Sequence, residues 1–271
     1  MPVQGMPACL RALASCAMVV EMATSFTLGH PTTLHTTHNV SILLKNIHTQ
    51  HMSAQRLSGY EVILLSNPQL EIKYTSPTSG PAPILNALLG LKGEQDEVVP
   101  QHKCIDLIHQ DTSPRPDMSS VALPDAQNVF VDGSCSRPND NTYHAGYAVV
   151  QFPYKILEAN PGPFQPAQAA ELIALTRACQ LFEGQDVNIY TDSKYAHGVT
   201  HDFGVIWERR GYIAADGKSI SHSTLVTNLL EAIQLPRSIA VLHCRAHTGQ
   251  QDDIAKGNAL ADKAAREAAS T

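Results

Sequence analysis

Two different periods of apolar residues run through the second half of the chain. Short runs rich in β-branched and aromatic residues predict strands at 128–131, 143–152, 155–159, 186–190 and 238–243. An apolar spacing of about 3.6 residues predicts a helix over 165–182, and start and stop signals place others at 193–199, 223–234 and 255–269. Three strands followed by alternating helices and strands are typical of a mixed sheet with helices on its faces. The chain is therefore expected to be an α/β protein.

The pattern in the first half of the chain is weaker. Its apolar runs, at 40–44 and 61–65, are short and lie among His, Thr, Ser and Pro residues. His30, His35 and His38 lie close together, but no cysteine pair completes a zinc site, and we expect none there. A Pro-rich stretch at 112–124 is typical of a linker. The change in composition near residue 125 indicates two domains.

Composition and charge narrow the class of protein. With 43% hydrophobic and 16% charged residues, a chain of 271 residues can bury a core and is not globally disordered. The net charge of −6 lacks the basic character typical of nucleic-acid binders. A site built from carboxylates to hold divalent cations is itself acidic, however, so the charge does not exclude nucleic-acid chemistry.

The cysteines and the N-terminal segment bear on location. Six cysteines are scattered without a C-x-x-C pair, which favours free thiols in a reducing compartment over a disulfide framework. The apolar run 8–23 is broken by Ser15 and Glu21, and no clean cleavage site follows it. We therefore expect no signal peptide and no membrane span. The expected location is intracellular, cytoplasmic or nuclear, or in a virion, rather than secreted.

Four acidic residues carry the candidate chemistry. Asp132 and Asp192 follow predicted strands, Glu171 lies among apolar residues of a predicted helix, and Asp262 lies in the last helix. Clustered carboxylates repel one another unless cations neutralise them, and oxygen ligands suit Mg²⁺ or Mn²⁺. Two such ions about 4 Å apart can activate water and stabilise the leaving oxygen of a phosphodiester. Each acid alone has a structural alternative: Asp192 as a helix cap, and Glu171 on an outer helix face.

Six segments of the second half resemble the ribonuclease H domain of retroviral Pol polyproteins of the gammaretrovirus type. They are VFVDGS (129–134), AAELIALTRA (169–178), NIYTDSKYA (188–196), WERRGY (207–212), LHCRAH (242–247) and KGNALADKAAREAA (256–269). They occur in the family's order, and together they are far more specific than one short motif. The resemblance implies a ribonuclease H-like mixed five-stranded sheet flanked by helices.

The resemblance also implies roles for particular residues. Asp132, Glu171, Asp192 and Asp262 would ligate two Mg²⁺ or Mn²⁺ ions, and His247 would help proton transfer and product release. Contacts to an RNA–DNA hybrid are expected from Ser134, Gln168, Tyr195, Asn258 and Arg266, and contacts to its phosphates from Arg209 and Arg210. Tyr195 and Trp207 have packing on the core as an alternative, and His247 an ordinary surface position. Asp202, Glu208 and Asp216 dilute the basic segment that relatives carry here.

The first half resembles the connection region of retroviral reverse transcriptases, through PACLRALA and CIDLIHQDTSPRPD (104–117). We therefore expect a smaller α/β connection-like domain over 1–117, a linker over 118–125 and a ribonuclease H domain over 126–271. The expected partners are an RNA–DNA hybrid and the polymerase part of a reverse transcriptase, with no membrane, and the chain is expected to be a monomer.

The sequence thus predicts an endoribonuclease that cleaves the RNA strand of RNA–DNA hybrids by two-metal-ion phosphodiester hydrolysis. One alternative is a catalytically weak nucleic-acid-binding remnant of a Pol protein, which the dilute basic surface favours. Another is a relic whose fold serves protein interaction.

Overall fold

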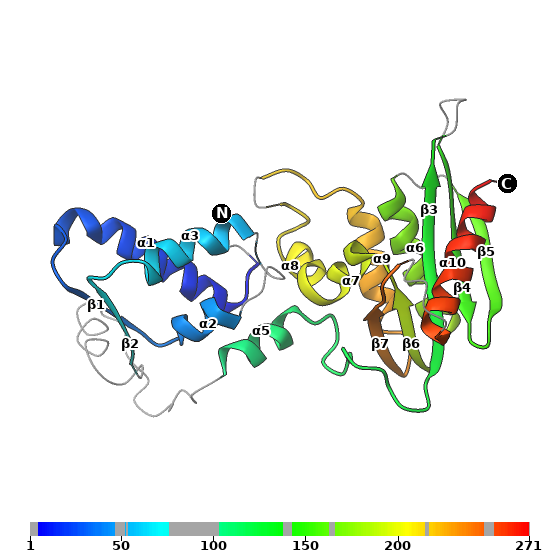
Figure 1. Ribbon diagram of the computed structural model, residues 1–271, viewed down its shortest axis with the longest axis horizontal. Coiled ribbons are helices and arrows are strands. Elements are labelled where there is room, and N and C mark those ends of the chain that lie inside the picture. Colours follow the sequence, from blue (N-terminus) through cyan, green and yellow to red (C-terminus); the bar gives the residue numbers. More distant parts are fainter. Residues whose placement is uncertain are drawn as a thin grey trace. The chain divides into compact units, whose positions relative to one another are not determined.

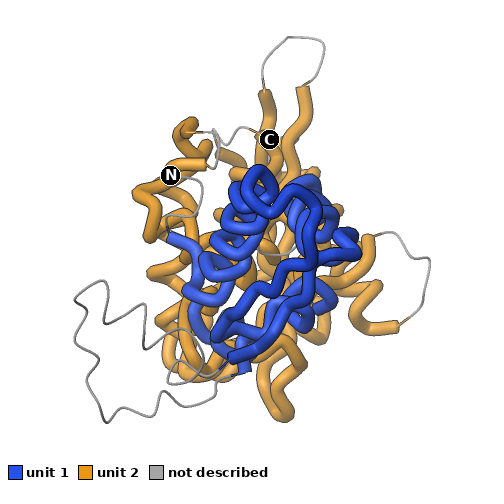
Figure 2. The backbone as a smooth tube through the Cα atoms, turned by 90° about the vertical axis from the view of Figure 1, so that its left-hand side faces the viewer, with its two compact units in different colours: residues 1–111 blue, residues 112–271 orange. Residues whose placement is uncertain are grey.

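The computed structural model describes residues 5–46, 52, 54–75, 103–137, 143–162, 166–214, 217–246 and 252–270. The chain divides into two compact units, Met1–Asp111 and Thr112–Thr271, shown in different colours in Figure 2. The sequence instead places the end of the first domain at residue 117.

The first unit is a small α/β unit, as the sequence predicts. Its elements are α1 (Ala8–Thr27), β1 (Thr32–Thr36), α2 (Val40–Asn46), α3 (Ala54–Leu65), β2 (Leu70–Tyr74) and α5 (Cys104–Thr112). Strands β1 and β2 pair in parallel. Residues of α1, α2, α3 and α5 form its buried apolar core.

Helix α1 is long and apolar enough to cross a membrane, by length and composition alone. It has 20 residues, and an 18-residue window within it has a mean hydropathy of 1.4. The same properties occur in the core helices of soluble proteins and in signal sequences. Residues such as Leu10 and Leu13 are fully buried in the unit, whereas Met22 and Phe26 are exposed. From the sequence, we expect no membrane span because Ser15 and Glu21 interrupt the apolar run. The mean hydropathy of an 18-residue window is a less strict criterion, because it allows a charged residue such as Glu21.

The second unit contains the predicted mixed sheet of five strands. They are β3 (Gln127–Ser136), β4 (His144–Gln151), β5 (Lys155–Gly162), β6 (Asp186–Thr191) and β7 (Ser238–His243), in the order β5-β4-β3-β6-β7. The β3–β4 and β4–β5 pairs are antiparallel, and the β3–β6 and β6–β7 pairs are parallel.

Helices cover both faces of this sheet (Figure 1). They are α6 (Ala167–Leu181), α7 (Lys194–Gly198), the π-helical turn η1 (Val199–Phe203), α8 (Gly204–Arg209), α9 (Ser223–Ala232) and α10 (Asp253–Ala269). Alternate residues of β3 enter different cores: Val129 and Val131 pack in the cluster of α6 and α9, and Phe130 packs in the cluster with Ala261 of α10. The central strand is therefore buried on both faces.

The predicted linker 118–125 belongs to the second unit and is hydrogen-bonded to its strands. The Ser119 amide donates a hydrogen bond to the Ile239 carbonyl at 3.0 Å, and the Leu123 amide donates to Asn188 Oδ1 at 2.7 Å. Just before it, the Arg115 guanidinium donates to the carbonyls of Ile233, Pro236 and Arg237. The Pro-rich composition identifies a segment without regular structure but does not reveal these long-range bonds.

Candidate metal centre and active site

The two strand-borne acids are brought together by parallel pairing. Strands β3 and β6 pair in register up to Val131 and Thr191, and the next residue in each chain segment is Asp132 or Asp192. The predicted strand end at residue 131 is wrong, because β3 continues to Ser136 through its pairing with β4. What ends at residue 131 is the pairing with β6, so both aspartates still lie at one edge of that pair.

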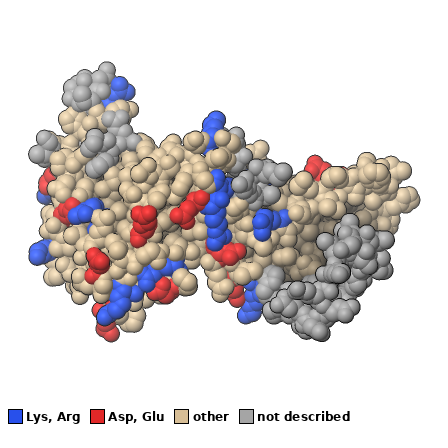
Figure 3. All heavy atoms as spheres, turned by 180° about the vertical axis from the view of Figure 1, so that it is seen from behind, with Lys and Arg blue, Asp and Glu red and all other residues tan. Residues whose placement is uncertain are grey.

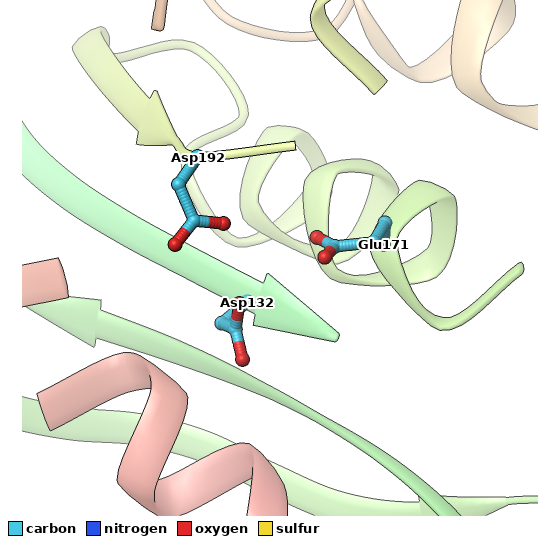
Figure 4. Close-up of side chains that lie close together, drawn as sticks. All are labelled: Asp132, Glu171 and Asp192. Atoms are coloured by element: carbon cyan, nitrogen blue, oxygen red, sulfur yellow. The ribbon is translucent and has the colours of Figure 1, made fainter. Parts of the chain in front are cut away.

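A glycine allows the third acid to approach. A Cβ atom on Gly133 would lie 2.3 Å from the backbone nitrogen of Glu171 and 2.4 Å from the carbonyl carbon of Ala170. Only glycine therefore permits helix α6 to lie this close to β3. The alternative of an exposed Glu171 is wrong, because its side chain points toward the two aspartates (Figure 4).

Asp132, Glu171 and Asp192 form one cluster. Each offers a carboxylate oxygen, and these oxygens all lie within 4.8 Å of one another. Glu171 Oε2 is buried and has no hydrogen-bond partner among the described residues. An unpaired buried carboxylate oxygen is costly, and a hard divalent cation would satisfy it. The cluster therefore fits Mg²⁺ or Mn²⁺.

The electrostatics of the cluster also favour a bound cation. Burial, reinforced by the charges of Asp192 and Asp262, raises the pKa of Asp132 to about 8. Burial, with the charges of Asp132 and Asp192, raises the pKa of Glu171 to about 9. Without a cation, these carboxyl groups hold protons near neutral pH, and a bound cation would displace them.

The fourth acid lies beside the cluster. Asp262 is half-buried on α10, and its charge raises the pKa values of Asp132 and Glu171. It is not among the three residues whose oxygens converge within 4.8 Å, and its carboxylate is ion-paired with Arg266. The structure therefore brings three of the four predicted ligands together, and ligation by Asp262 stays a prediction.

The structural alternative for Asp192 is wrong. The cap of helix α7 is Ser193, whose side chain accepts a hydrogen bond from the Ala196 amide. Asp192 Oδ2 instead accepts a hydrogen bond of 2.9 Å from Asn258 Nδ2. Asn258 is only 4% exposed, so the side chain expected to contact substrate is engaged with a carboxylate of the site.

Of the other predicted substrate-contact residues, Ser134 is half-buried on β3. Gln168 lies exposed in the first turn of α6, and Arg209 lies exposed at the end of α8. Arg210 is half-buried and interacts with another group. On the face drawn in Figure 3, acidic and basic side chains are interspersed on a mostly uncharged surface. Their contacts with a nucleic acid stay predictions.

Tyr195 takes part in an aromatic cluster. Its ring centroid lies 6.3 Å from that of Phe203 and 6.5 Å from that of Trp207, and all three pack against the main core. The alternative of packing on the core is therefore confirmed for Trp207. Tyr195 also packs on the core, and its contact with substrate stays a prediction. His247 lies outside the described residues.

The sequence does not predict the hydrogen bonds of Asn258. Cys244 donates a hydrogen bond from its thiol to Asn258 Oδ1 at 3.4 Å, beside the bond from Asn258 to Asp192. Burial, with the nearby charge of Asp192, raises the pKa of Cys244 to about 12, so its thiol stays protonated. Asp192 and Asn258 are 66 residues apart, and no local pattern in the sequence signals their contact.

Converging carboxylates at one edge of a mixed sheet, with a buried oxygen that suits a cation, define a candidate metal-dependent hydrolase. The family model for RNase H matches residues 124–270, more than half of the chain. The chain belongs to the RNase H family.

The similarity to individual proteins extends over the first unit as well. The chain is 36% identical over 265 residues to the Pol polyprotein of feline endogenous virus ECE1 and 37% identical over 267 residues to the Gag-Pol polyprotein of avian reticuloendotheliosis virus. Each comparison covers 98% of this chain but only 25% and 22%, respectively, of the relative. The chain thus spans about a quarter of the length of these retroviral relatives.

Solved structures give weaker matches. The solution structure of the PFV RNase H domain matches 54% of this chain and 94% of that one at 26% identity, with a TM-score of 0.46. The foamy viral protease-reverse transcriptase in complex with RNA/DNA hybrid matches 95% of this chain and 32% of that one at 20% identity, with a TM-score of 0.49. The family membership rests on the match of residues 124–270 to the RNase H family model.

Proposed function

We propose that the chain hydrolyses phosphodiester bonds in the RNA strand of RNA–DNA hybrids, with divalent cations held by Asp132, Glu171, Asp192 and Asp262. The observation that carries this proposal is the convergence of three carboxylates within 4.8 Å, with one buried Glu171 oxygen left without a partner. Membership of the RNase H family supports the reaction and the substrate class.

The roles of the chain's own residues follow from their positions. When bound at this cluster, two divalent ions would activate water and stabilise the leaving oxygen of the phosphodiester. Asp132 on β3, Glu171 on α6 and Asp192 directly after β6 would hold these ions, and the sheet and α6 hold the three carboxylates in place. Asp262 would join them by exchanging its ion pair with Arg266 for a cation. His247 would carry the proton of the leaving group, because an imidazole titrates near neutral pH.

Recognition of the hybrid would rest on shape, 2′-hydroxyls and backbone phosphates rather than on base edges. Ser134 and Gln168 lie on the two elements that carry Asp132 and Glu171. They would contact the sugars next to the scissile bond. Arg209 and Arg210 would contact phosphates farther along the duplex. The first unit would act as the connection region of a reverse transcriptase, with a polymerase part as its partner.

A second candidate is a nucleic-acid-binding module with little turnover. The net charge of −6, and the engagement of Arg266 with Asp262, favour weak binding. This candidate predicts binding of the hybrid without cleavage in Mg²⁺ or Mn²⁺.

The test is cleavage of a 5′-labelled RNA strand in an RNA–DNA hybrid, beside an RNA duplex and single-stranded RNA, in Mg²⁺ and in Mn²⁺. The proposal predicts cleavage confined to the hybrid, lost in EDTA and lost in Asp132→Asn. Cleavage of the hybrid by Asp132→Asn at the rate of the unsubstituted chain would remove the basis of the proposal. Binding without cleavage would favour the second candidate.

A further inference from the structure

Two polar side chains outside the acid cluster form a chain of hydrogen bonds that ends on it. Cys244, one residue after β7, donates its thiol proton to Asn258 Oδ1 at 3.4 Å. Asn258, on α10, donates from Nδ2 to Asp192 Oδ2 at 2.9 Å. The chain therefore joins β7, α10 and the end of β6 at one point.

We propose that Cys244 and Asn258 are positioning residues that orient the Asp192 carboxylate for cation binding. This inference rests on the proposed function, since it assigns these side chains a role toward the cations of that site. Neither residue needs to touch the substrate or the cation. Their effect is to restrict the rotation of one ligand before the cation arrives.

The carboxylate of Asp192 and the thiol of Cys244 favour the same orientation of the Asn258 amide. An Asn side chain carries one acceptor and one donor group, and the two orientations of the amide exchange them. A protonated thiol is a donor toward the amide oxygen, so it favours the orientation in which Nδ2 faces Asp192. With the amide reversed, Oδ1 would face a carboxylate oxygen, and the two acceptors would repel each other.

Burial strengthens the hydrogen bonds that hold the amide in this orientation. Asn258 is 4% exposed and Cys244 is 8% exposed, so water competes poorly for their hydrogen bonds. The neighbouring Gly257 allows α10 to lie close to β3, because a Cβ atom there would lie 2.3 Å from the ring of Phe130 on β3. This close packing brings Asn258 within hydrogen-bonding distance of Asp192.

The experiment is a calorimetric titration of the full chain with Mn²⁺, in the absence of nucleic acid. Asn258→Ala removes the donor to Asp192, and we expect Mn²⁺ affinity to fall by about 10- to 100-fold, as for other partners of metal ligands. Cys244→Ala removes the donor that supports this orientation of the amide, and we expect a smaller loss of about fivefold, which corresponds to one hydrogen bond. Cys244→Ser keeps a donor and should retain the affinity to within about twofold.

Cys179→Ala is the matched control. Cys179 is fully buried in the core on α6, and Cys179→Ala removes the same atoms as Cys244→Ala. Melting temperatures should fall for both substitutions, whereas Mn²⁺ affinity should fall only for Cys244→Ala. This separates positioning of the ligand from general loss of packing.

Two results would overturn the inference. One is an unchanged Mn²⁺ affinity in a folded Asn258→Ala chain, which would leave the proposed function standing if the unsubstituted chain cleaves the hybrid. The other is an equal loss of affinity in Cys244→Ala and Cys179→Ala. If the substitutions weaken Mn²⁺ binding as expected but the unsubstituted chain does not cleave the hybrid, the positioning role stands and the proposed function fails.

Discussion

At the scale of single residues, the carboxylates of the site lower the stability of the folded chain when no cation is bound. Asp132 and Glu171 are placed where burial and mutual repulsion raise both pKa values, and Glu171 Oε2 has no partner. The sequence predicts all three acids of the cluster, because each stands in a recognisable motif. It does not predict the Cys244–Asn258–Asp192 contacts, since these depend on how α10 docks on the sheet. Strain of this kind is typical of sites that a ligand completes.

The raised pKa values predict a pH dependence of stability in EDTA. In the unfolded chain, Asp132 and Glu171 release their protons near 3.8 and 4.5, whereas in the folded chain their pKa values are about 8 and about 9. The stability gained by holding these protons is fully present below the unfolded pKa values and is lost as pH rises through the folded ones. The free energy of unfolding, measured by urea denaturation at pH 5, 7 and 9, should therefore decrease from acid to alkaline pH.

Asp132→Asn isolates the contribution of the cluster from that of other titrating groups. It should flatten the pH dependence and raise the free energy of unfolding at pH 9 by about 1 kcal/mol. If the substitution leaves the difference between pH 5 and pH 9 unchanged, the raised pKa values are not a property of the folded chain.

Gly133→Ala tests the close approach of α6. The added methyl group would overlap the backbone at Glu171, so α6 must move away from β3. We expect a loss of roughly 1–3 kcal/mol of stability, together with weaker Mn²⁺ binding. Gly59→Ala is the control, because Gly59 is exposed in helix α3 with nothing within 4 Å of an added Cβ. It should stabilise the chain by about 0.5–1 kcal/mol, and equal effects of the two substitutions would refute this account of Gly133.

At the scale of elements, local patterns predict the kinds and order of the strands and helices in the second unit. Strand β7 has the predicted bounds, 238–243. Strand β3 ends five residues later than predicted, at Ser136 instead of Val131, because its second half is stabilised by pairing with β4, a partner that the local sequence does not contain. Local patterns also do not predict the hydrogen bonds of Arg115, since its partners Ile233 and Pro236 lie about 120 residues away.

The packing of residues 112–125 predicts where the second unit can be cut. A chain of residues 112–271 keeps the bonds of Arg115, Ser119 and Leu123, and one of residues 126–271 loses them. Because hydrogen bonds from a charged group contribute about 1.5–3 kcal/mol, the shorter chain should melt at least about 5 °C lower.

Point substitutions in the 112–271 chain provide the control for this comparison. Arg115→Ala should reproduce much of the loss in melting temperature. Lys263→Ala, which removes a surface ion pair with Glu267, should change it little. Equal melting temperatures for the two truncated chains would show that the segment is a linker after all.

At the scale of the whole molecule, charge governs how a hybrid would bind. The chain has a net charge of −6, so affinity would depend on a few local cations. The change in composition near residue 125 predicts two domains, whereas the two compact units divide between Asp111 and Thr112. The pattern of the first half predicts only an α/β unit, because its apolar runs are short and the paired strands β1 and β2 lie far apart in sequence.

Salt dependence tests which cations contact the duplex. In an Asp132→Asn background, in which we expect no cleavage, Arg209→Ala should weaken hybrid binding and reduce the slope of log affinity against log salt by about 1. Arg237→Ala is the control, because Arg237 is paired with Asp186 at the opposite ends of β6 and β7 from Asp192. Fluorescence anisotropy from 50 to 200 mM KCl measures both, and equal slopes for the two variants would argue against a role for Arg209.

The central claim is that the cluster of Asp132, Glu171 and Asp192 performs hydrolysis of the hybrid. Single-turnover cleavage of a labelled RNA–DNA hybrid in Mg²⁺ by Glu171→Gln, beside Glu183→Gln, tests it most directly. Both substitutions neutralise a glutamate at nearly unchanged size, but Glu171 faces Asp132 and Asp192 whereas Glu183 is exposed beyond the end of α6. The account predicts a loss of at least about 100-fold for Glu171→Gln and an unchanged rate for Glu183→Gln. Equal cleavage rates for the two variants would contradict it.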